Sequence, residues 1–255
     1  MLARRVIPCL DVHHGTVVKG VSFRQLQYAG DPVELASRYV EEGADEIALL
    51  DISASIEGRE TFIEVIGRVA SEINIPFLVG GGVRGAEDAY KMLVNGADKV
   101  AVNTAAIQDP SIISAISGRF GAQCTVLAID AKREVSGEKT WFQVFSHSAT
   151  RPTGMDAVEW AVRGEELGAG EILLTSIDQD GRKTGYDVEL IRRVTESVSI
   201  PVIASGGAGD LRHFLDAIKI GGSDAVLAAS VFHYRVYTVR QVKEYLRSQG
   251  IEVRI

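Results

Sequence analysis

Two aspartates in corresponding places of the chain are the first candidates for chemistry. Asp11 ends the apolar run RVIPCLD, and Asp130 lies near the end of the similar run TVLAIDA. A carboxylate that ends an apolar strand is partly removed from water, which tends to raise its pKa and suits it to donate or accept protons near neutrality. Each aspartate alone could instead cap the loop that follows it. Their symmetric placement favours a catalytic pair.

Small residues follow four other apolar runs, again in two equivalent places. In the first half of the chain they are Gly82, Asn103 and Thr104, and in the second half Gly206, Gly207, Ala229 and Ser230. Side chains of this size let an anion reach backbone N–H groups at a helix start. A single Gly-Gly pair is more often a tight turn, but two equivalent sets predict two phosphate sites. A bulky residue at Gly82 or Gly207 should weaken binding, with much less effect on folding.

Polar residues after two further apolar runs could contact a substrate between the carboxylates. Asp51 ends the run EIALLD, and Thr175 lies in EILLTS, with Asp180 and Gly181 shortly after it. Asp51, Thr175 and Asp180 could hydrogen-bond substrate hydroxyls. Asp180 and Gly181 are equally an ordinary turn pair, so both interpretations stay open for them.

Charged residues stand where four of the apolar runs begin. They are Arg5, Glu46, Lys99 and Glu171. Their signs alternate along the chain, so salt bridges between them could close the bottom of a barrel, with plain stabilisation as the default role. The histidines show no spacing typical of metal ligands, and the two cysteines form no Cys/His cluster. We therefore expect no metal site.

The elements that must position these residues are repeated once along the chain. Residues 73–84, INIPFLVGGGVR, return as VSIPVIASGGAG at 198–209, about half the chain later. The repeat predicts two half-barrels, at about 1–122 and 123–255. Because each half alone would leave open sheet edges, we expect them to be fused into one domain of residues 1–255.

Eight short apolar runs alternate with amphipathic segments, several of which open on Asp or Asp-Pro and close on Gly, as capped helices do. The runs are RVIPCLD, EIALLDI, PFLVGGG, KVAVNTA, TVLAIDA, EILLTSI, PVIASGG and AVLAASV. This alternation predicts an α/β fold with a closed parallel sheet, the (β/α)8 or TIM barrel. In such a ring Asp11 and Asp130 face each other across the mouth. Residues 13–31 and 132–154 are too long for turns and belong to the same face, and the first could form a lid centred on Lys19.

Composition excludes several classes of partner. The formal net charge is −7 and no run of Lys or Arg marks a basic stripe, which argues against nucleic-acid binding. No apolar run has the length of a membrane span, and the N-terminus is unlike a signal peptide. These features predict a cytoplasmic protein.

Whole motifs of the chain are similar to those of a known family. They are PCLDV, GTVVKGVSF, LLDISAS, VGGGVR, KVAVNTAA, AIDAKR, PTGMDAVEWA, GAGEILLTSIDQDG, ASGGAG and LAASVFH. Together they resemble the cyclase subunit of imidazole glycerol phosphate synthase, from histidine biosynthesis, over essentially the whole chain.

This resemblance implies a lyase and cyclase that uses neither a cofactor nor a metal. The implied substrate is a bisphosphate, phosphoribulosyl formimino aminoimidazole carboxamide ribonucleotide. With ammonia it yields imidazole glycerol phosphate and an aminoimidazole carboxamide ribonucleotide. Asp11 and Asp130 match the family's general acid/base pair. The positions that match residues supporting substrate binding, loop closure or proton traffic are Lys19, Asp51, Asn103, Thr175 and Asp180.

The resemblance also implies a partner. In this family a glutaminase subunit docks on the face where the strands start and sends ammonia up through the barrel, so the charged ring of Arg5, Glu46, Lys99 and Glu171 would be its gate. This chain has no cysteine in a Gly-x-Cys-x-Gly elbow, and we expect a heterodimer.

Some positions depart from the family's usual pattern, namely Thr16, Gln27-Tyr28 and Ser148-Ala149. They leave both carboxylates and both phosphate sites intact, so they bear on loop dynamics and rate. Two other functions stay open. One is the related phosphoribosyl formimino aminoimidazole carboxamide ribonucleotide isomerase, which usually lacks the KGVSF loop and the charged ring. The other is a non-catalytic phosphate-binding barrel.

Overall fold

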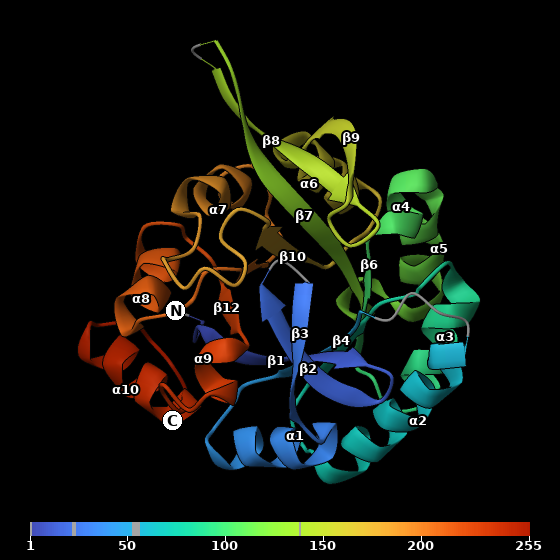
Figure 1. Ribbon diagram of the computed structural model, residues 1–255. Coiled ribbons are helices and arrows are strands. Elements are labelled where there is room, and N and C mark those ends of the chain that lie inside the picture. The colour runs from blue at the N-terminus through green and yellow to red at the C-terminus, as the bar shows by residue number, and fades with distance from the viewer. Residues whose placement is uncertain (1, 22–23, 53–56, 138) are drawn as a thin grey trace.

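A closed ring of parallel strands surrounded by helices forms the fold (Figure 1). The computed structural model describes residues 2–21, 24–52, 57–137 and 139–255. Within these ranges the ring consists of β1 (Arg5–His13), β4 (Ile47–Asp51), β5 (Phe77–Gly80), β6 (Lys99–Val102), β7 (Thr125–Ser136), β10 (Glu171–Ser176), β11 (Val202–Ser205) and β12 (Ala225–Ala228). Each strand pairs with the next in this order, and β12 pairs with β1. The predicted (β/α)8 barrel is confirmed.

Helices cover the outside of the ring. They are α1 (Pro32–Glu41), α2 (Glu57–Glu72), α3 (Ala86–Val94), α4 (Thr104–Gln108), α5 (Ser111–Phe120), α6 (Ala157–Glu166), α7 (Val188–Thr195), α8 (Leu211–Lys219), α9 (Ser230–His233) and α10 (Val239–Ser248), with the 3-10 turn η1 (Ala122–Cys124). Local chemistry sets several starts. The Asp31 side chain accepts the first free N–H groups of α1, with Pro32 at the first helical position, and Asp156 caps α6 in the same way.

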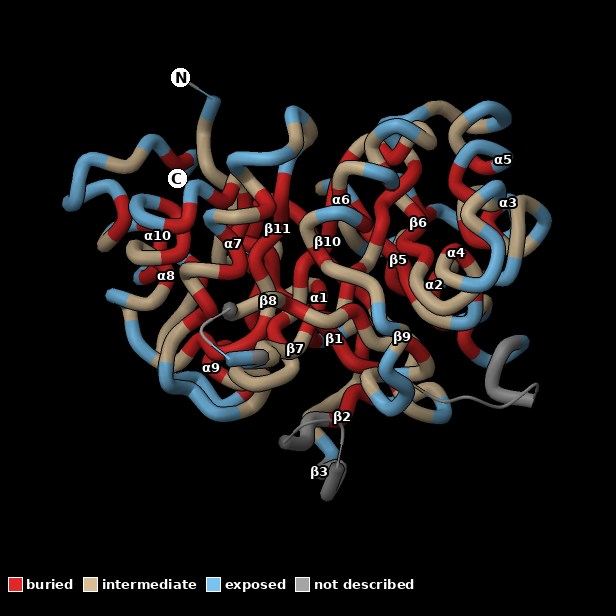
Figure 2. The backbone as a smooth tube through the Cα atoms, turned by 90° about the horizontal axis from the view of Figure 1, so that it is seen from above, coloured by how far each residue is buried: buried red, intermediate tan, exposed pale blue. Residues whose placement is uncertain are grey.

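Alternation along the strands separates two apolar cores. Side chains that face the axis form a small cluster that includes Cys9, Ala101 and Leu173. Those on the other side of the strands pack against the helices in the main core. Figure 2 shows buried backbone through the middle of the molecule and exposed backbone mainly at its periphery. Since successive side chains point to opposite faces, the residue two positions after Cys9 or Ala101 faces the axis as well. This places Asp11 and Asn103 at the mouth.

Three aspartates fix the starts of the strands. The carboxylates of Asp45, Asp98 and Asp224 each accept the N–H of a residue at the start of the preceding strand of the ring, at 2.9, 2.8 and 3.1 Å. They belong to the repeated motifs GAD, GAD and GSD. The fourth motif is GAG, and a Cβ on its Gly170 would lie 2.2 Å from the carbonyl oxygen of Ala122. Glycine therefore replaces aspartate where η1 comes too close.

The two long stretches predicted at the mouth fold into antiparallel strands. β2 (Thr16–Val21) and β3 (Arg24–Gly30) pair after β1, and they project from the face opposite to the N-terminus (Figure 2). Strand β7 continues beyond the ring to pair with β8 (Lys139–Ser146), which pairs with β9 (Arg151–Asp156). Because β7 and β8 extend away from the ring (Figure 1), we call their outer part, residues 132–143, the arm. No helix in the described ranges is long and apolar enough to cross a bilayer.

Candidate active site

A cavity of about 490 Å³ opens at the carboxyl ends of the ring strands. It brings together the residues predicted from the sequence for this end of the barrel, Lys19 excepted: Asp11, Asp51, Gly82, Asn103, Thr104, Asp130, Thr175, Asp180, Gly181, Gly206, Gly207, Ala229 and Ser230. Lys19 lies in β2, and its side chain falls outside what the structure describes. The single cavity supports one continuous site across both halves of the chain.

The two candidate carboxylates come from opposite strands. β1 and β7 are four strands apart in either direction around the ring, so Asp11 and Asp130 stand on opposite walls of the cavity. The Asp11 side chain is buried, and its Oδ1 accepts the Cys9 thiol at 3.5 Å. Cys9 is thus a hydrogen-bond partner of Asp11. The position of Cys9 in the sequence did not indicate this contact.

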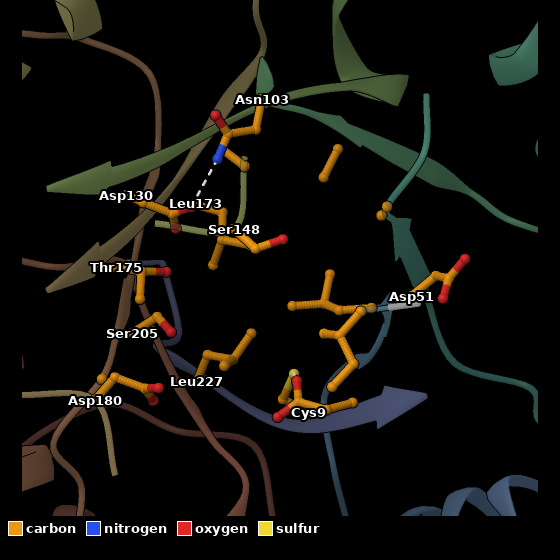
Figure 3. Close-up of a pocket in the computed structure, with 18 of the residues that line it drawn as sticks. Cys9, Asp51, Asn103, Asp130, Ser148, Leu173, Thr175, Asp180, Ser205 and Leu227 are labelled. Carbon is orange, nitrogen blue, oxygen red and sulfur yellow. Dashed lines mark hydrogen bonds between the residues drawn. The ribbon is translucent and has the colours of Figure 1, made fainter. Parts of the chain in front are cut away.

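Asp130 has a strongly altered acidity. Removal from water raises the pKa of its carboxyl to about 6, the hydrogen bond from Asn103 partly offsets this, and the charge of Asp180 adds to it. The Nδ2 group of Asn103 donates to Asp130 Oδ2 at 2.8 Å, the dashed line in Figure 3. The direction predicted from the strand-end position is confirmed for this residue. A group with this pKa is present in both protonation states close to neutral pH.

Hydroxyl and amide groups surround Asp130 at one level of the ring. Thr175 is paired in register with Asp130 on one side and with Ser205 on the other, and Figure 3 shows Thr175, Ser205 and Asp180 on the same side of the cavity as Asp130. Asp51 lies across from them. Ser205 was missed by the sequence analysis, although it follows the axis-facing Ile203 by two positions and alternation could have found it.

The first set of small residues combines backbone freedom with a hydroxyl. Gly82 has a φ of +68°, and Thr104 is the first residue of α4. The Oγ1 atom of Thr104 accepts the backbone N–H of His147 at 2.9 Å. His147 and Ser148 therefore complete the wall of the cavity. The sequence placed their stretch, residues 132–154, at this face but did not predict these two contacts, because they are made through the turn between β8 and β9.

The second set shows that its glycines have a structural role too. Gly206 and Gly207 have φ values of +91° and +109°, and a Cβ on Gly207 would lie 2.0 Å from the carbonyl oxygen of Gly185. The expectation that a bulky residue at Gly207 would affect folding much less than binding is therefore wrong. The sequence allows Asp180 and Gly181 to be either a turn pair or residues of the site, and the structure gives them both features. The Asp180 N–H closes a turn on Ser176, Gly181 has a φ of +74°, and both line the cavity.

The predicted charged ring closes the other end of the barrel. Arg5 contacts Glu46 at 2.6 Å and also pairs with Glu171, while Lys99 contacts the same two carboxylates at 2.9 and 2.7 Å. Burial opposes the charge of Arg5, but the two carboxylates outweigh it and the Arg5 pKa is raised. Each cation thus bridges both acids, and the ring has no unpaired charge among its four members.

Comparison with known proteins relates the chain to named relatives. Residues 5–238 match the family described as "Histidine biosynthesis protein". The chain is 58% identical over 255 residues to "Imidazole glycerol phosphate synthase subunit HisF" of Dehalococcoides mccartyi strain BAV1, which covers 100% of this chain and 99% of the relative. It is 57% identical, with the same coverage, to the protein of that name from strain 195.

Proposed function

The chain belongs to the histidine biosynthesis protein family, and from that premise we propose that it is the cyclase subunit of imidazole glycerol phosphate synthase. The relatives are named as subunits of that synthase. The observation that carries the proposal is the pair Asp11 and Asp130, on opposite walls of one cavity that also holds both sets of small residues. An acid/base pair in this arrangement can act on a substrate held at both ends.

The proposed substrate is phosphoribulosyl formimino aminoimidazole carboxamide ribonucleotide, a bisphosphate long enough to lie across the mouth. One phosphate would bind at Gly82, Asn103 and Thr104, and the other at Gly206, Gly207, Ala229 and Ser230. Both sets line the same cavity. Since the chain carries a net charge of −7, local backbone and hydroxyl donors would have to hold these anions.

Asp11 and Asp130 would exchange protons with the substrate while ammonia joins it, the imidazole ring closes and the molecule splits. The products are imidazole glycerol phosphate and an aminoimidazole carboxamide ribonucleotide. The raised pKa of Asp130 supports this role, because a group that titrates near pH 6 can both donate and accept protons. Asp51, Thr175 and Asp180 would hold the hydroxyl groups between the carboxylates. Lys19 would act in the closing of the β2–β3 segment.

Ammonia would come from a glutaminase subunit docked on the face where the strands start, in a cytoplasmic heterodimer. The ring of Arg5, Glu46, Lys99 and Glu171 would then act as a gate. Its position below the apolar axis cluster supports passage of neutral ammonia, because an ammonium ion would be costly to desolvate there.

The test is an assay of the purified protein with the bisphosphate, with and without an ammonium salt. We expect turnover only when ammonia is supplied. Turnover without ammonia would identify the related isomerase, and binding without turnover would identify a non-catalytic phosphate-binding barrel. Either result overturns the proposal.

A further inference from the structure

The loop between β10 and α7, residues 177–187, carries Asp180 and Gly181 into the cavity. We propose that Arg133, which lies on β7 in the arm, is the positioning residue that holds this loop and through it Asp180. The inference rests on the proposed function only for the role of Asp180 at the substrate. The contacts by which Arg133 holds the loop do not depend on that role.

Arg133 holds the beginning of the loop with its backbone. Its N–H donates to Asp178 Oδ2 at 2.8 Å, and two residues earlier the Ala131 carbonyl accepts the N–H of Ile177 at 2.9 Å. Strand β7 has left β10 at this point to pair with β8. The Asp178 carboxylate therefore accepts an N–H group for which β10 no longer supplies a carbonyl.

The same residue holds the end of the loop with its side chain. Arg133 Nη2 donates to Asp187 Oδ1 at 2.7 Å, and its Nη1 pairs with Glu189 of α7. Asp187 is buried and caps α7 by accepting the N–H of Leu190 at 3.1 Å. One residue thus fixes both ends of a loop whose middle enters the cavity.

Arg133 is itself fixed by the arm. It is paired with Phe142 across β7 and β8, and its guanidinium lies 4.8 Å from the centroid of that fully buried ring. Because about a third of the Arg133 side chain is exposed, its ion pairs contribute little to stability by themselves. The role of these ion pairs is to orient the loop, because a small misplacement of a reacting group lowers the reaction rate far more than it lowers stability.

The position of the loop also matters for Asp130, which precedes Arg133 by three residues on the same strand. The charge of Asp180 helps to raise the pKa of Asp130. A loop that moved away would change the substrate contact of Asp180 and the protonation of Asp130 together.

Arg193 of α7 provides a matched control. Its guanidinium lies 5.4 Å from the same Phe142 ring, and it donates to Thr140 O at 2.9 Å and to Glu189 Oε1 at 2.6 Å. Arg193→Met therefore removes the same charge from the same ring but keeps the contact to Asp187, which Arg133→Met breaks, and the backbone contact to Asp178 remains in both variants.

The experiment compares Arg133→Met with Arg193→Met in the full chain. With the bisphosphate and an ammonium salt, Arg133→Met should lower kcat by about tenfold, whereas Arg193→Met should stay within about twofold. Hydrogen exchange should become faster at residues 177–187 in Arg133→Met only. If Arg133→Met folds poorly, Asp178→Ala serves as the second test. It releases the beginning of the loop and should show both effects.

Equal losses of kcat and unchanged exchange at 177–187 in the two arginine variants would overturn the proposal and leave Arg133 a merely structural residue. The exchange measurement needs no turnover. If the wild-type protein shows no ammonia-dependent activity, the proposed function fails, while the exchange difference still decides whether Arg133 positions the loop.

Discussion

Asp130 is held in surroundings that favour its neutral form. Its carboxyl would ionise at an ordinary pKa of 3.8 in the unfolded chain and ionises at about 6 in the fold. Between these values the folded state binds more protons, so wild-type stability falls as the pH rises from about 4 to 6 and stays lower above. The cost at neutral pH is on the order of 3 kcal/mol. The raised pKa of Asp130 therefore lowers the stability of the fold at neutral pH but leaves a carboxyl that can still carry a proton there.

Asp130→Asn should separate these two effects. It keeps the shape and can still accept the amide of Asn103, but it no longer ionises. We expect kcat with saturating ammonia to fall by about 10² to 10⁴, while urea unfolding at about pH 7.5 shows a more stable protein. This gain in stability should fade as the pH is lowered from 6 to below 4. A variant less stable than wild type at pH 7.5, or one with near-normal turnover, would contradict the assignment.

At the scale of elements, the ends of the repeated apolar runs made much of the site predictable. Asp11, Asn103, Asp130 and Thr175 could be placed at the mouth because they lie at or near the ends of apolar runs. Strand alternation then explains why their side chains face the axis. The contacts of His147 and Arg133 could not be predicted. They depend on β7 leaving the ring and on the β8–β9 turn folding back, and neither has a local signature.

The β8–β9 turn contains a strained segment that can be tested. His147, Ser148 and Ala149 have φ values of +52°, +51° and +61°, a left-handed conformation that costs about 1 to 2 kcal/mol for a residue with a Cβ. Ala149→Gly should therefore keep or raise the free energy of unfolding, by up to about 1 kcal/mol. Ala115→Gly, at an exposed position inside α5, is the matched control and should lose about 1 kcal/mol. Equal losses at both sites would show that the turn is unstrained.

At the scale of the whole molecule, the barrel has two different ends. The mouth presents polar groups to a cavity, whereas the opposite end is closed by ion pairs between side chains that are at most 18% exposed. The alternating charges in the sequence predicted this ring, and the described contacts confirm its salt bridges. Its role as a gate stays a prediction, because a ring that only stabilises would have the same contacts.

Lys99→Leu distinguishes a gate from a stabilising ring. If ammonia passes here, the variant should lose much more glutamine-dependent synthesis, measured with the glutaminase subunit, than synthesis driven by added ammonium salt, which enters at the open mouth. Lys243→Met is the control for lost stability, because it breaks a buried ion pair with Asp45 at 3.0 Å that lies outside the ring. Breaking such a pair costs about 3 to 5 kcal/mol. We expect Lys243→Met to lose glutamine-dependent synthesis and ammonium-driven synthesis equally. Equal losses in Lys99→Leu as well would leave the ring only structural.

Strand β7 is mechanically a beam that is held at two places. Six of its residues, Val126–Ala131, are built into the barrel wall by pairing with β10, and the strand beyond them projects into the arm. At about 3.3 Å per residue, the tip at Ser136 extends roughly 16 Å beyond this support. The second support lies on the arm, where Arg133 donates to Asp187 and Thr140 O accepts a hydrogen bond from Arg193 of α7. We therefore expect the backbone at Asp130, which lies within the first support and three residues before Arg133, to stay in place when a molecule enters the cavity.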